Sequence, residues 1–181
     1  MLADKRLLWR LQRGDKDALR EIHEKHEGDL LTLAAHLLHD AGAAEDIVQD
    51  VFVAFVRAAP RLQLRRSLGG YLATAVANRV RDRFRRLARE RLAPLEDVGH
   101  RVAEADGPVR MVMRTEAKQR LRQAVAALPY EQREVIMLRM HADMKFKEIA
   151  QHQNVSIKTA LSRYRYGLDK LHEMLDGEVP K

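Results

Sequence analysis

Side chains that can donate hydrogen bonds gather near the C-terminus, in the stretch EIAQHQNVSIKTALSRYRYGLDKL at residues 148–171. Arginine can bind guanine, and hydroxyl groups can bond bases or phosphates, when a helix that carries them enters the major groove of DNA. A solvated basic face is the commoner meaning of such a run, so this stretch alone leaves DNA binding open. The candidate donors are Ser156, Lys158, Thr159, Ser162, Arg163 and Arg165.

The apolar pattern of the same stretch predicts the elements that would present these donors. Ile149 and Ala150 share one face of a short helix, and Asn154 can adopt the left-handed conformation that a tight turn needs. Ser156 can cap a longer helix, on which apolar residues recur every three or four positions. We therefore expect a helix, a turn and a second helix whose polar side carries the donors.

A second cationic segment covers residues 61–91, where ten arginines stand against two acidic residues. Such a concentration of charge binds phosphates by releasing counterions, and its affinity falls as salt rises. Part of the run can instead be solvated or paired, as Asp82 and Arg86 could be, one helical turn apart. The helical spacing predicts a DNA-facing set made of Asn78, Arg81, Arg85 and Arg89. It predicts a buried set made of Leu68, Leu72, Val76, Val80, Phe84 and Leu87.

A third candidate surface is acidic and lies on the stretch AEDIVQDVFVAFV at residues 44–56. Apolar residues form one stripe of the predicted helix, which leaves an acidic face with an outward valine on the other side. Carboxylates in a first turn can simply favour the positive end of the helix dipole, but this interpretation does not cover Asp50 or Val53. We therefore predict a protein-docking surface made of Glu45, Asp46, Gln49, Asp50 and Val53.

Two helical modules are predicted to carry these surfaces. The chain has 181 residues, 46% of them hydrophobic, and a formal charge of +7, and no stretch alternates as a half-buried strand would. Proline and glycine breakers favour a linker at 92–109 between modules at 1–91 and 110–181, rather than a long surface loop within one domain. The helices expected in this all-α fold span residues 4–13, 15–39, 43–58, 68–91, 110–127, 130–141, 145–152 and 156–175. Asp143 and Ser156 are the expected N-caps, and Pro129 is expected in a first turn.

Composition excludes or disfavours several classes of site. The chain has no cysteine, so it can form no disulfide, thiol nucleophile or cysteine-bound zinc site. The pairs His23/His26 and His36/His39 have metal-compatible spacing, but no HExxH motif or glycine-rich phosphate loop accompanies them, so no metal and no cofactor are predicted. No apolar run approaches the roughly 18 residues of a membrane span, and the start is too charged for a signal peptide. We therefore expect a cytoplasmic protein without membrane insertion.

The C-terminal stretch ALPYEQREVIMLRMHADMKFKEIAQHQNVSIKTALSRYRYGLDKL resembles the DNA-binding region of small bacterial sigma factors, the extracytoplasmic-function (ECF) type of the sigma-70 family. The resemblance rests on the Leu-Pro helix start, the REVIMLR helix, the EIA motif and the T-x-x-SR motif, in that order. The chain departs from the family pattern at Gln153, Asn154, Ala160 and Leu161. Leu161 can touch a thymine methyl but cannot bond a phosphate, so no basic role is assigned there.

The N-terminal module resembles the same family. AEDIVQDVFVAFV is similar to the segment that binds the clamp-helix coiled coil of RNA polymerase, and YLATAVANRVRDRFRR is similar to the segment that recognises the downstream promoter element and holds its opened strand. This likeness places Arg86 at a family arginine, and it places Arg65 and Arg66 in a loop that would capture an unstacked base. Tyr71 is the nearest aromatic residue, and packing is favoured over stacking for it.

The resemblance implies a promoter-specificity subunit that binds core RNA polymerase, recognises the promoter and assists DNA opening at transcription initiation, without being an enzyme. The C-terminal module would read the upstream element and the arginine-rich helix the downstream element, and an anti-sigma partner would cover these surfaces. The alternative is a free-standing helix-turn-helix regulator whose N-terminal module dimerises through the 44–56 helix and which binds DNA without polymerase.

Overall fold

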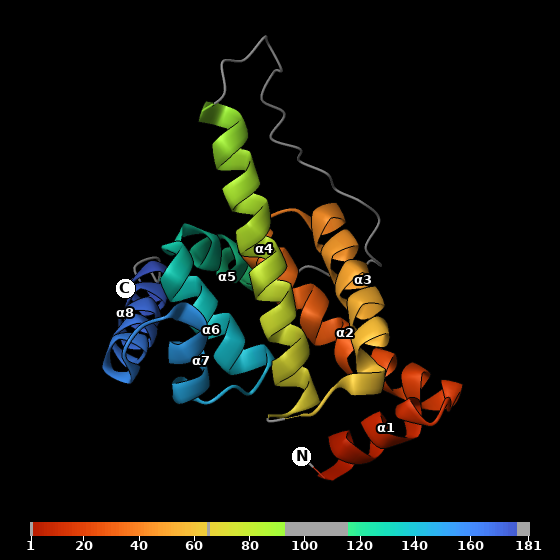
Figure 1. Cartoon of the computed structure of the whole chain (residues 1–181). Helices are drawn as coiled ribbons and strands as arrows, with labels where there is room; N and C mark the ends of the chain where they lie inside the picture. The colour runs from red at the N-terminus through yellow and green to blue at the C-terminus, as the bar shows by residue number, and fades with distance from the viewer. Residues whose placement is uncertain (1, 65, 93–115, 177–181) are drawn as a thin grey trace.

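The computed structural model describes residues 2–64, 66–92 and 116–176. Within these ranges the chain forms eight α-helices and one short 3₁₀ helix, and no strand (Figure 1). The N-terminal module comprises α1 (Leu2–Gln12), α2 (Lys16–Leu38), α3 (Ala41–Ala58), η1 (Ala59–Arg61) and α4 (Leu68–Leu92). The C-terminal module comprises α5 (Glu116–Ala127), α6 (Tyr130–His141), α7 (Phe146–Gln153) and α8 (Ile157–Asp176). The predicted all-α fold in two modules is confirmed, while residues 93–109 of the predicted linker lie outside the described residues.

An aspartate caps the start of α2, and another caps the start of α3. The Asp15 carboxylate accepts the backbone N–H of Asp17 at 2.9 Å at the start of α2. The Asp40 carboxylate accepts the backbone N–H of Ala43 at 3.0 Å at the start of α3. Between these helices His39 takes a left-handed conformation with φ 59°, which ends α2. The tight joint folds α3 back onto α2, and both helices pack against α4.

The turn between α7 and α8 follows the sequence prediction. Asn154 has φ 53°, and its backbone N–H bonds back to the last turn of α7. The Ser156 hydroxyl accepts the backbone N–H of Thr159 at 3.0 Å, which caps α8. The left-handed turn residue and the serine cap are therefore both confirmed.

Two of the predicted helix-start residues have other roles. Asp143 does not cap α7: it lies in the preceding turn with φ 47°, and the backbone N–H of Lys145 donates instead to the Glu148 carboxylate at 2.8 Å. Pro129 lies immediately before α6 rather than in its first turn. Both positions depend on how the loop leaves the preceding helix, which the residue types alone do not determine.

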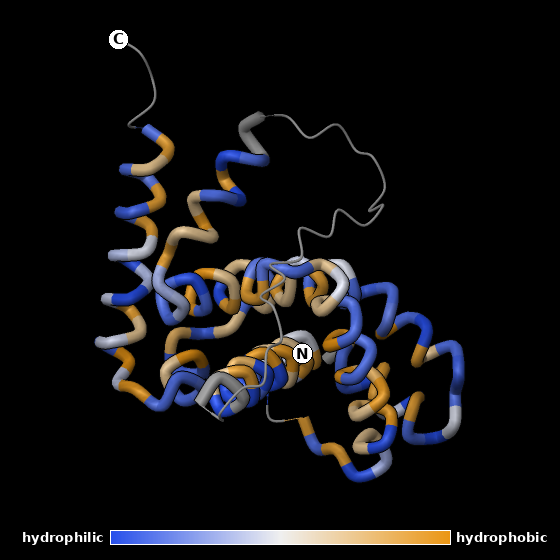
Figure 2. Tube along the Cα trace, turned by 90° about the horizontal axis from the view of Figure 1, so that it is seen from above, coloured by the Kyte–Doolittle hydropathy of each residue, from blue (hydrophilic) through white to orange (hydrophobic). Residues whose placement is uncertain are grey.

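The two modules pack against each other in the described structure. Helix α6 contacts both α2 and α4, and the buried residues of the two modules form one continuous hydrophobic cluster (Figure 1). The rings of Phe84 and Tyr130 meet edge-on across this interface at 5.6 Å between centroids. Figure 2 shows hydrophobic and hydrophilic residues alternating along the helices, as expected of helices that each bury one side.

Helix α4 extends beyond the helices that pack against it. Its first half is buried at Leu68, Leu72 and Val76, as predicted, and its C-terminal end projects beyond the other helices (Figure 1). Phe84 and Leu87 were predicted to be buried on the same stripe, but they are 38% and 40% exposed. At Phe84 the C-terminal module covers only one side of α4, through Tyr130, so burial of Phe84 and Leu87 is the part of the prediction that is wrong.

His36 occupies the interface between the modules, on α2. Burial lowers the pKa of His36 to about 4, and electrostatic interactions with the neighbouring His141, Arg122, His39 and Arg133 act in the same direction. His141 and Arg133 belong to α6, and Arg122 belongs to α5. Groups on both of these helices therefore disfavour protonation of His36. The folded protein therefore keeps this imidazole neutral.

Acid should destabilise the fold through His36. In the unfolded chain His36 takes up a proton near its ordinary pKa of 6.5, whereas the folded chain resists protonation until about 4, so stability falls as pH falls through this window. We expect the melting temperature of the wild-type chain to fall more steeply than that of His36→Gln between about pH 7 and about pH 4.5. The control is His172→Gln, on an exposed part of α8. Parallel curves for the wild type and His36→Gln would contradict the expectation.

Candidate functional site

Helix α8 presents most of the predicted donors to solvent. Ser156, Lys158, Thr159 and Arg165 are exposed, whereas Ser162 and Arg163 are half-buried. The hydroxyls of Ser156 and Thr159 lie 2.8 Å apart and form a pair at the helix N-terminus. This end of α8 therefore combines hydroxyl groups, free backbone N–H groups and cationic side chains, which together suit a phosphate or a base edge.

Close packing on α6 holds α8 in place. Ala160 is fully buried and Leu171 is 8% exposed on the side opposite the donors. Gly167 is also buried, and a Cβ atom at this position would lie only 2.7 Å from Ile136 Cδ1 and 3.3 Å from Gln132 Cβ. The glycine lets the two helices approach closely, so the donors of α8 have a defined position relative to α6.

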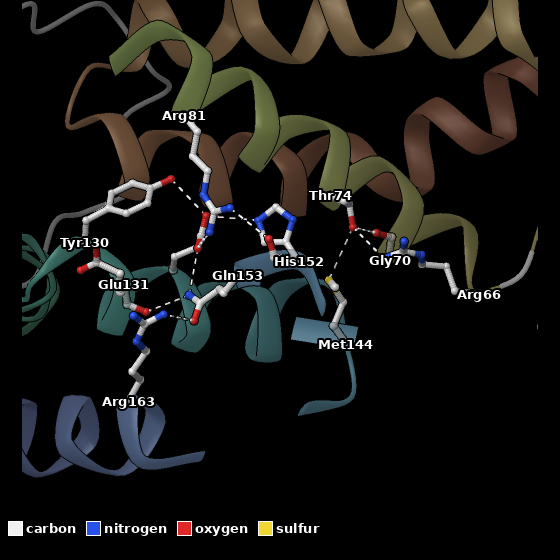
Figure 3. A network of polar contacts seen from close by, with 11 residues as sticks. Arg66, Gly70, Thr74, Arg81, Tyr130, Glu131, Met144, His152, Gln153 and Arg163 are labelled. Carbon is white, nitrogen blue, oxygen red and sulfur yellow. Dashed lines mark hydrogen bonds and ion pairs between the residues drawn. The ribbon is translucent and has the colours of Figure 1, made fainter. Parts of the chain in front are cut away.

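A buried carboxylate organises the polar contacts beneath this surface. Glu134 on α6 is 0% exposed, and its carboxylate accepts the Tyr130 hydroxyl at 3.1 Å and the Gln153 side-chain amide at 2.9 Å. The His152 ring nitrogen Nε2 lies 3.3 Å from the same carboxylate, and the Arg81 guanidinium donates to it from α4 (Figure 3). We call these five residues the Glu134 cluster.

The donors of the Glu134 cluster keep the carboxylate ionised. Burial by itself would raise the pKa of Glu134, but the hydrogen bond from His152, the charge of Arg81 and the hydrogen bond from Gln153 hold this pKa below its usual value. A buried charge with this many partners is tolerated, whereas removal of a partner leaves it poorly compensated. Sequence reasoning missed Glu134 because it lies in a helix whose other buried residues are mostly apolar.

The Glu134 cluster also holds one residue of α8. The Arg163 guanidinium donates to the Gln153 side-chain carbonyl at 2.9 Å, and the Gln153 amide donates to the backbone carbonyl of Glu131 at 3.0 Å (Figure 3). Gln153 occupies a position where the family pattern has an apolar residue. Its burial as a hydrogen-bonded bridge between α6 and α8 gives this departure a structural role.

The predicted DNA-facing residues of α4 fall into two groups. Asn78, Arg85 and Arg89 are exposed, as is Arg86. Arg81 instead lies in the interface between the modules, where its second hydrogen bond goes to the backbone carbonyl of His152 at 3.0 Å. The spacing that places Arg81 beside the exposed residues is correct, but the sequence gives no sign that another module covers it.

The residues around the start of α4 are partly engaged within the N-terminal module. Arg65 lies outside the described residues, and the Arg66 guanidinium donates to the Thr74 hydroxyl at 3.0 Å. Tyr71 is half-buried with its ring 6.3 Å from that of Phe55, as expected of a packing residue.

The suggested pairing of Asp82 with Arg86 is not what the structure shows. Asp82 forms its ion pair with Arg85, three residues on. Both spacings bring side chains to the same side of a helix, so the residue types could not choose between them.

The acidic surface on α3 is exposed to solvent. Glu45, Asp46, Gln49 and Asp50 are exposed, and Val53 is 51% exposed, while the opposite side of the helix packs into the core. An exposed valine among carboxylates is poorly suited to DNA and well suited to a protein partner.

The histidine pairs do not assemble a metal centre in the part of the chain that the structure describes. No group of three or more histidine, aspartate or glutamate side chains there could hold an ion. His23 instead stacks on Phe52, with ring centroids 4.5 Å apart, and lies 3.4 Å from Glu27. None of the described helices is long and apolar enough to cross a membrane.

The fold and its surface charges define a class: a helical protein with two cationic surfaces suited to DNA and an acidic face suited to a protein partner. Comparison with known protein families identifies the family within this class. The family models for Sigma-70 region 2 and for Sigma-70, region 4 match residues 22–90 and 118–171, in the expected order. The chain belongs to the sigma-70 family of RNA polymerase sigma factors, and within it to the ECF type.

Individual relatives agree with this assignment. The chain is 27% identical over 180 residues to RNA polymerase sigma-H factor of Pseudomonas aeruginosa, with 92% of each chain covered. It is 24% identical over 179 residues to ECF RNA polymerase sigma factor SigW of Bacillus subtilis, with 94% of this chain and 96% of the relative covered. It is 29% identical over 142 residues to ECF RNA polymerase sigma factor SigD of Mycobacterium tuberculosis, with 76% and 67% covered.

Solved structures share the fold. CnrH, in complex with the cytosolic domain of CnrY, superposes with a TM-score of 0.67 at 26% identity, covering 98% of this chain and 99% of that one. The sigma factor RpoE from Bartonella quintana, in complex with the anti-sigma factor NepR, gives a TM-score of 0.68 at 21% identity, with 88% and 98% covered. The protein is thus a promoter-recognition subunit of RNA polymerase, and nothing in the comparisons supports a free-standing regulator.

The packing of α8 against α6 should be sensitive to the volume of the side chain at position 167. Valine at this position would push into Ile136 and Gln132, and we expect Gly167→Val to lower the free energy of unfolding by about 1–3 kcal/mol. The matched control is Gly28→Val on α2, where an added Cβ meets nothing within 4 Å. Denaturant unfolding measures both variants, and equal losses would show that close packing is not what Gly167 provides.

Proposed function

We propose that the two modules divide the work of this sigma factor. Residues 1–91 bind core polymerase and the downstream promoter element, residues 92–109 link the modules, and residues 110–181 bind the upstream element. The placement of the two family matches, at 22–90 and 118–171, supports this division. The single observation that carries it is the separation of charge, with an acidic exposed face on α3 and cationic exposed faces on α4 and α8.

The acidic face of α3 is the proposed polymerase contact. Its members, Glu45, Asp46, Gln49, Asp50 and Val53, are all exposed on one side of the helix. Negative charge there repels DNA and favours a partner with complementary charge, and the exposed valine adds apolar contact. By family resemblance the partner is the clamp-helix coiled coil of core polymerase.

The N-terminal part of α8 is the proposed reader of the upstream element. Ser156, Lys158, Thr159 and Arg165 are exposed toward a bound duplex, and Leu161 is 39% exposed beside them. Arginine can bridge a guanine, and leucine can contact a thymine methyl. Ser162 and Arg163 complete the set, with Arg163 oriented by Gln153.

The exposed side of α4 is the proposed contact for the downstream element. Asn78, Arg85, Arg86 and Arg89 supply the amide and cationic groups that hold an opened strand. Unstacking bases costs a few kcal/mol per step, which contacts to backbone and base can offset. The remaining members proposed for this surface are Arg65, Arg66 and Arg81.

The proposed partners set where and how the protein acts. It works by binding polymerase and promoter DNA, in the cytoplasm where both are found, and it supplies no catalytic group of its own. An anti-sigma factor is a further proposed partner, supported by the structure of the 26% identical CnrH, which was solved in complex with the cytosolic domain of CnrY.

Loss of the α3 face should weaken polymerase binding. We expect Asp50→Ala combined with Val53→Ala to reduce affinity for core polymerase by about tenfold or more, because a charge and an apolar contact are removed together. Both side chains are exposed, so the circular dichroism and melting temperature should stay unchanged. The control is Glu24→Ala, exposed on α2. Unchanged core affinity in the double variant would count against this docking surface.

Loss of Arg165 should affect the promoter more than the polymerase. We expect Arg165→Ala to reduce transcription from promoters that need the upstream element by about 5- to 100-fold, while core binding remains within about twofold. The comparison variant is Lys170→Ala, exposed further along α8. In vitro transcription and a core-binding assay measure the two effects, and equal losses in both would contradict the division of labour.

A further inference from the structure

Helix α1 contacts η1 in the α3–α4 connection, residues 59–64 and 66–67 (Figure 1). The Gln12 side-chain amide donates to the backbone carbonyls of Ala59 at 2.9 Å and of Leu62 at 3.1 Å. Ala59 begins η1 and Leu62 directly follows it, so one side chain holds the backbone at both ends of this short helix. Both acceptors are backbone carbonyls, so the contact constrains the path of the chain whatever its side chains are.

The other end of α1 holds the start of α4. The Asp4 carboxylate accepts the backbone N–H of Leu68, the first residue of α4, at 2.9 Å, and the Lys25 ammonium at 3.0 Å. Asp4 is 6% exposed and Leu68 is fully buried, so water has little access to this N–H. Burial by itself would raise the pKa of Asp4, but these two donors hold it below its usual value. Asp4 is thus an ionised cap for α4 that comes from 64 residues away in the sequence.

The residues directly before α4 are attached to the first turns of this helix. The Ser67 hydroxyl accepts the backbone N–H of Gly70 at 3.1 Å. The Arg66 guanidinium donates to the Thr74 hydroxyl at 3.0 Å, and this hydroxyl donates to the Gly70 carbonyl at 2.7 Å (Figure 3). The position of Arg66 therefore follows the position of the start of α4, which Asp4 holds.

We propose that α1 is a positioning element for the downstream promoter contact, in which Asp4 and Gln12 hold the α3–α4 connection and the start of α4 in the conformation that captures an opened strand. The role rests on the proposed function of Arg66 and the exposed side of α4. A connection that is already ordered loses less conformational entropy when DNA binds, so α1 adds affinity without touching DNA. Helix α1 lies outside the match to Sigma-70 region 2, which begins at residue 22.

Other contacts keep α1 in place when these hydrogen bonds are removed. Leu8 is 5% exposed and belongs to the hydrophobic core, and α1 packs against α2. Arg10 forms ion pairs with Asp15 and Glu21, each at 2.8 Å. None of these contacts involves the Asp4 carboxylate or the Gln12 amide. Variants at those two positions can therefore release the α3–α4 connection while α1 stays folded onto the module.

Hydrogen exchange in the free, full-length protein tests the cap without DNA. We expect Asp4→Ala to speed exchange of the Leu68 amide by about tenfold or more, because the start of α4 then opens more often. The Ala43 amide, which the Asp40 carboxylate accepts at 3.0 Å, is the internal reference. The matched control is Lys5→Ala, exposed on α1. Unchanged exchange of the Leu68 amide in folded Asp4→Ala would overturn the role of Asp4.

Holoenzyme binding tests the consequence for DNA. The probe is a single-stranded oligonucleotide that carries the downstream element of a promoter transcribed by the wild type. We expect Asp4→Ala combined with Gln12→Ala to lower affinity for this probe by about tenfold, while affinities for core polymerase and for an upstream-element duplex stay within about twofold. Asp4→Asn keeps an oxygen acceptor for the Leu68 amide, so it should recover most of the affinity.

The split between these three affinities separates positioning from stability. A general loss of folding would lower all three together, and such an equal loss would overturn the proposal, as would an unchanged affinity for the probe. Gln12→Glu provides a variant at an exposed position, which should fold even if Asp4→Ala does not. A carboxylate cannot donate to the two carbonyls, so we expect Gln12→Glu to lower affinity for the probe by about 3- to 10-fold.

The wild-type holoenzyme distinguishes failure of this proposal from failure of the proposed function. If it does not bind the probe at all, the proposed downstream contact is wrong, and the positioning role falls with it. If it binds the probe and the Gln12→Glu and double variants bind equally well, only the positioning role is overturned.

Discussion

The buried carboxylate of Glu134 is the interaction on which the arrangement of this protein depends. It receives donors from α4, from α6 and from both His152 and Gln153 of α7. Since an ionised group away from water is tolerated only when its partners are in place, the requirement to satisfy this one charge aligns three helices. The alignment extends to α8 through Gln153, so the helix-turn-helix and the arginine-rich helix are positioned by the same group.

The distribution of charge over the surface follows a consistent division. Carboxylates are exposed on α3, where the proposed partner is a protein, and arginines are exposed on α4 and α8, where the proposed partner is DNA. The net charge of +7 alone would describe only a basic protein. In the proposed function, the placement of the opposite charges on separate helices lets polymerase and promoter bind at the same time without competing for one surface.

Local chemistry made most of the fold predictable from the sequence. Asn154 and Ser156 carry the turn and the cap by their own side-chain and backbone preferences, so their roles could be read from the residue types. Arg81 and Phe84 could not be placed in the same way, because the contact of Arg81 with Glu134 and the exposure of Phe84 depend on how far the C-terminal module covers α4. Glu134 gave little local signal, and Gln153 stood out in the sequence only as a polar residue at an apolar family position.

The overhang of α4 has a consequence for the thermodynamics of promoter binding. Its final turns lack neighbouring helices and carry several arginines, among them Arg85, Arg86 and Arg89, whose mutual repulsion opposes helical order. The helix is nevertheless formed through Leu92, so an anionic strand that neutralises these arginines would relieve repulsion within a helix that already exists. Binding at this end then gains stabilisation from the repulsion that it removes, and the affinity should fall as salt screens the same charges.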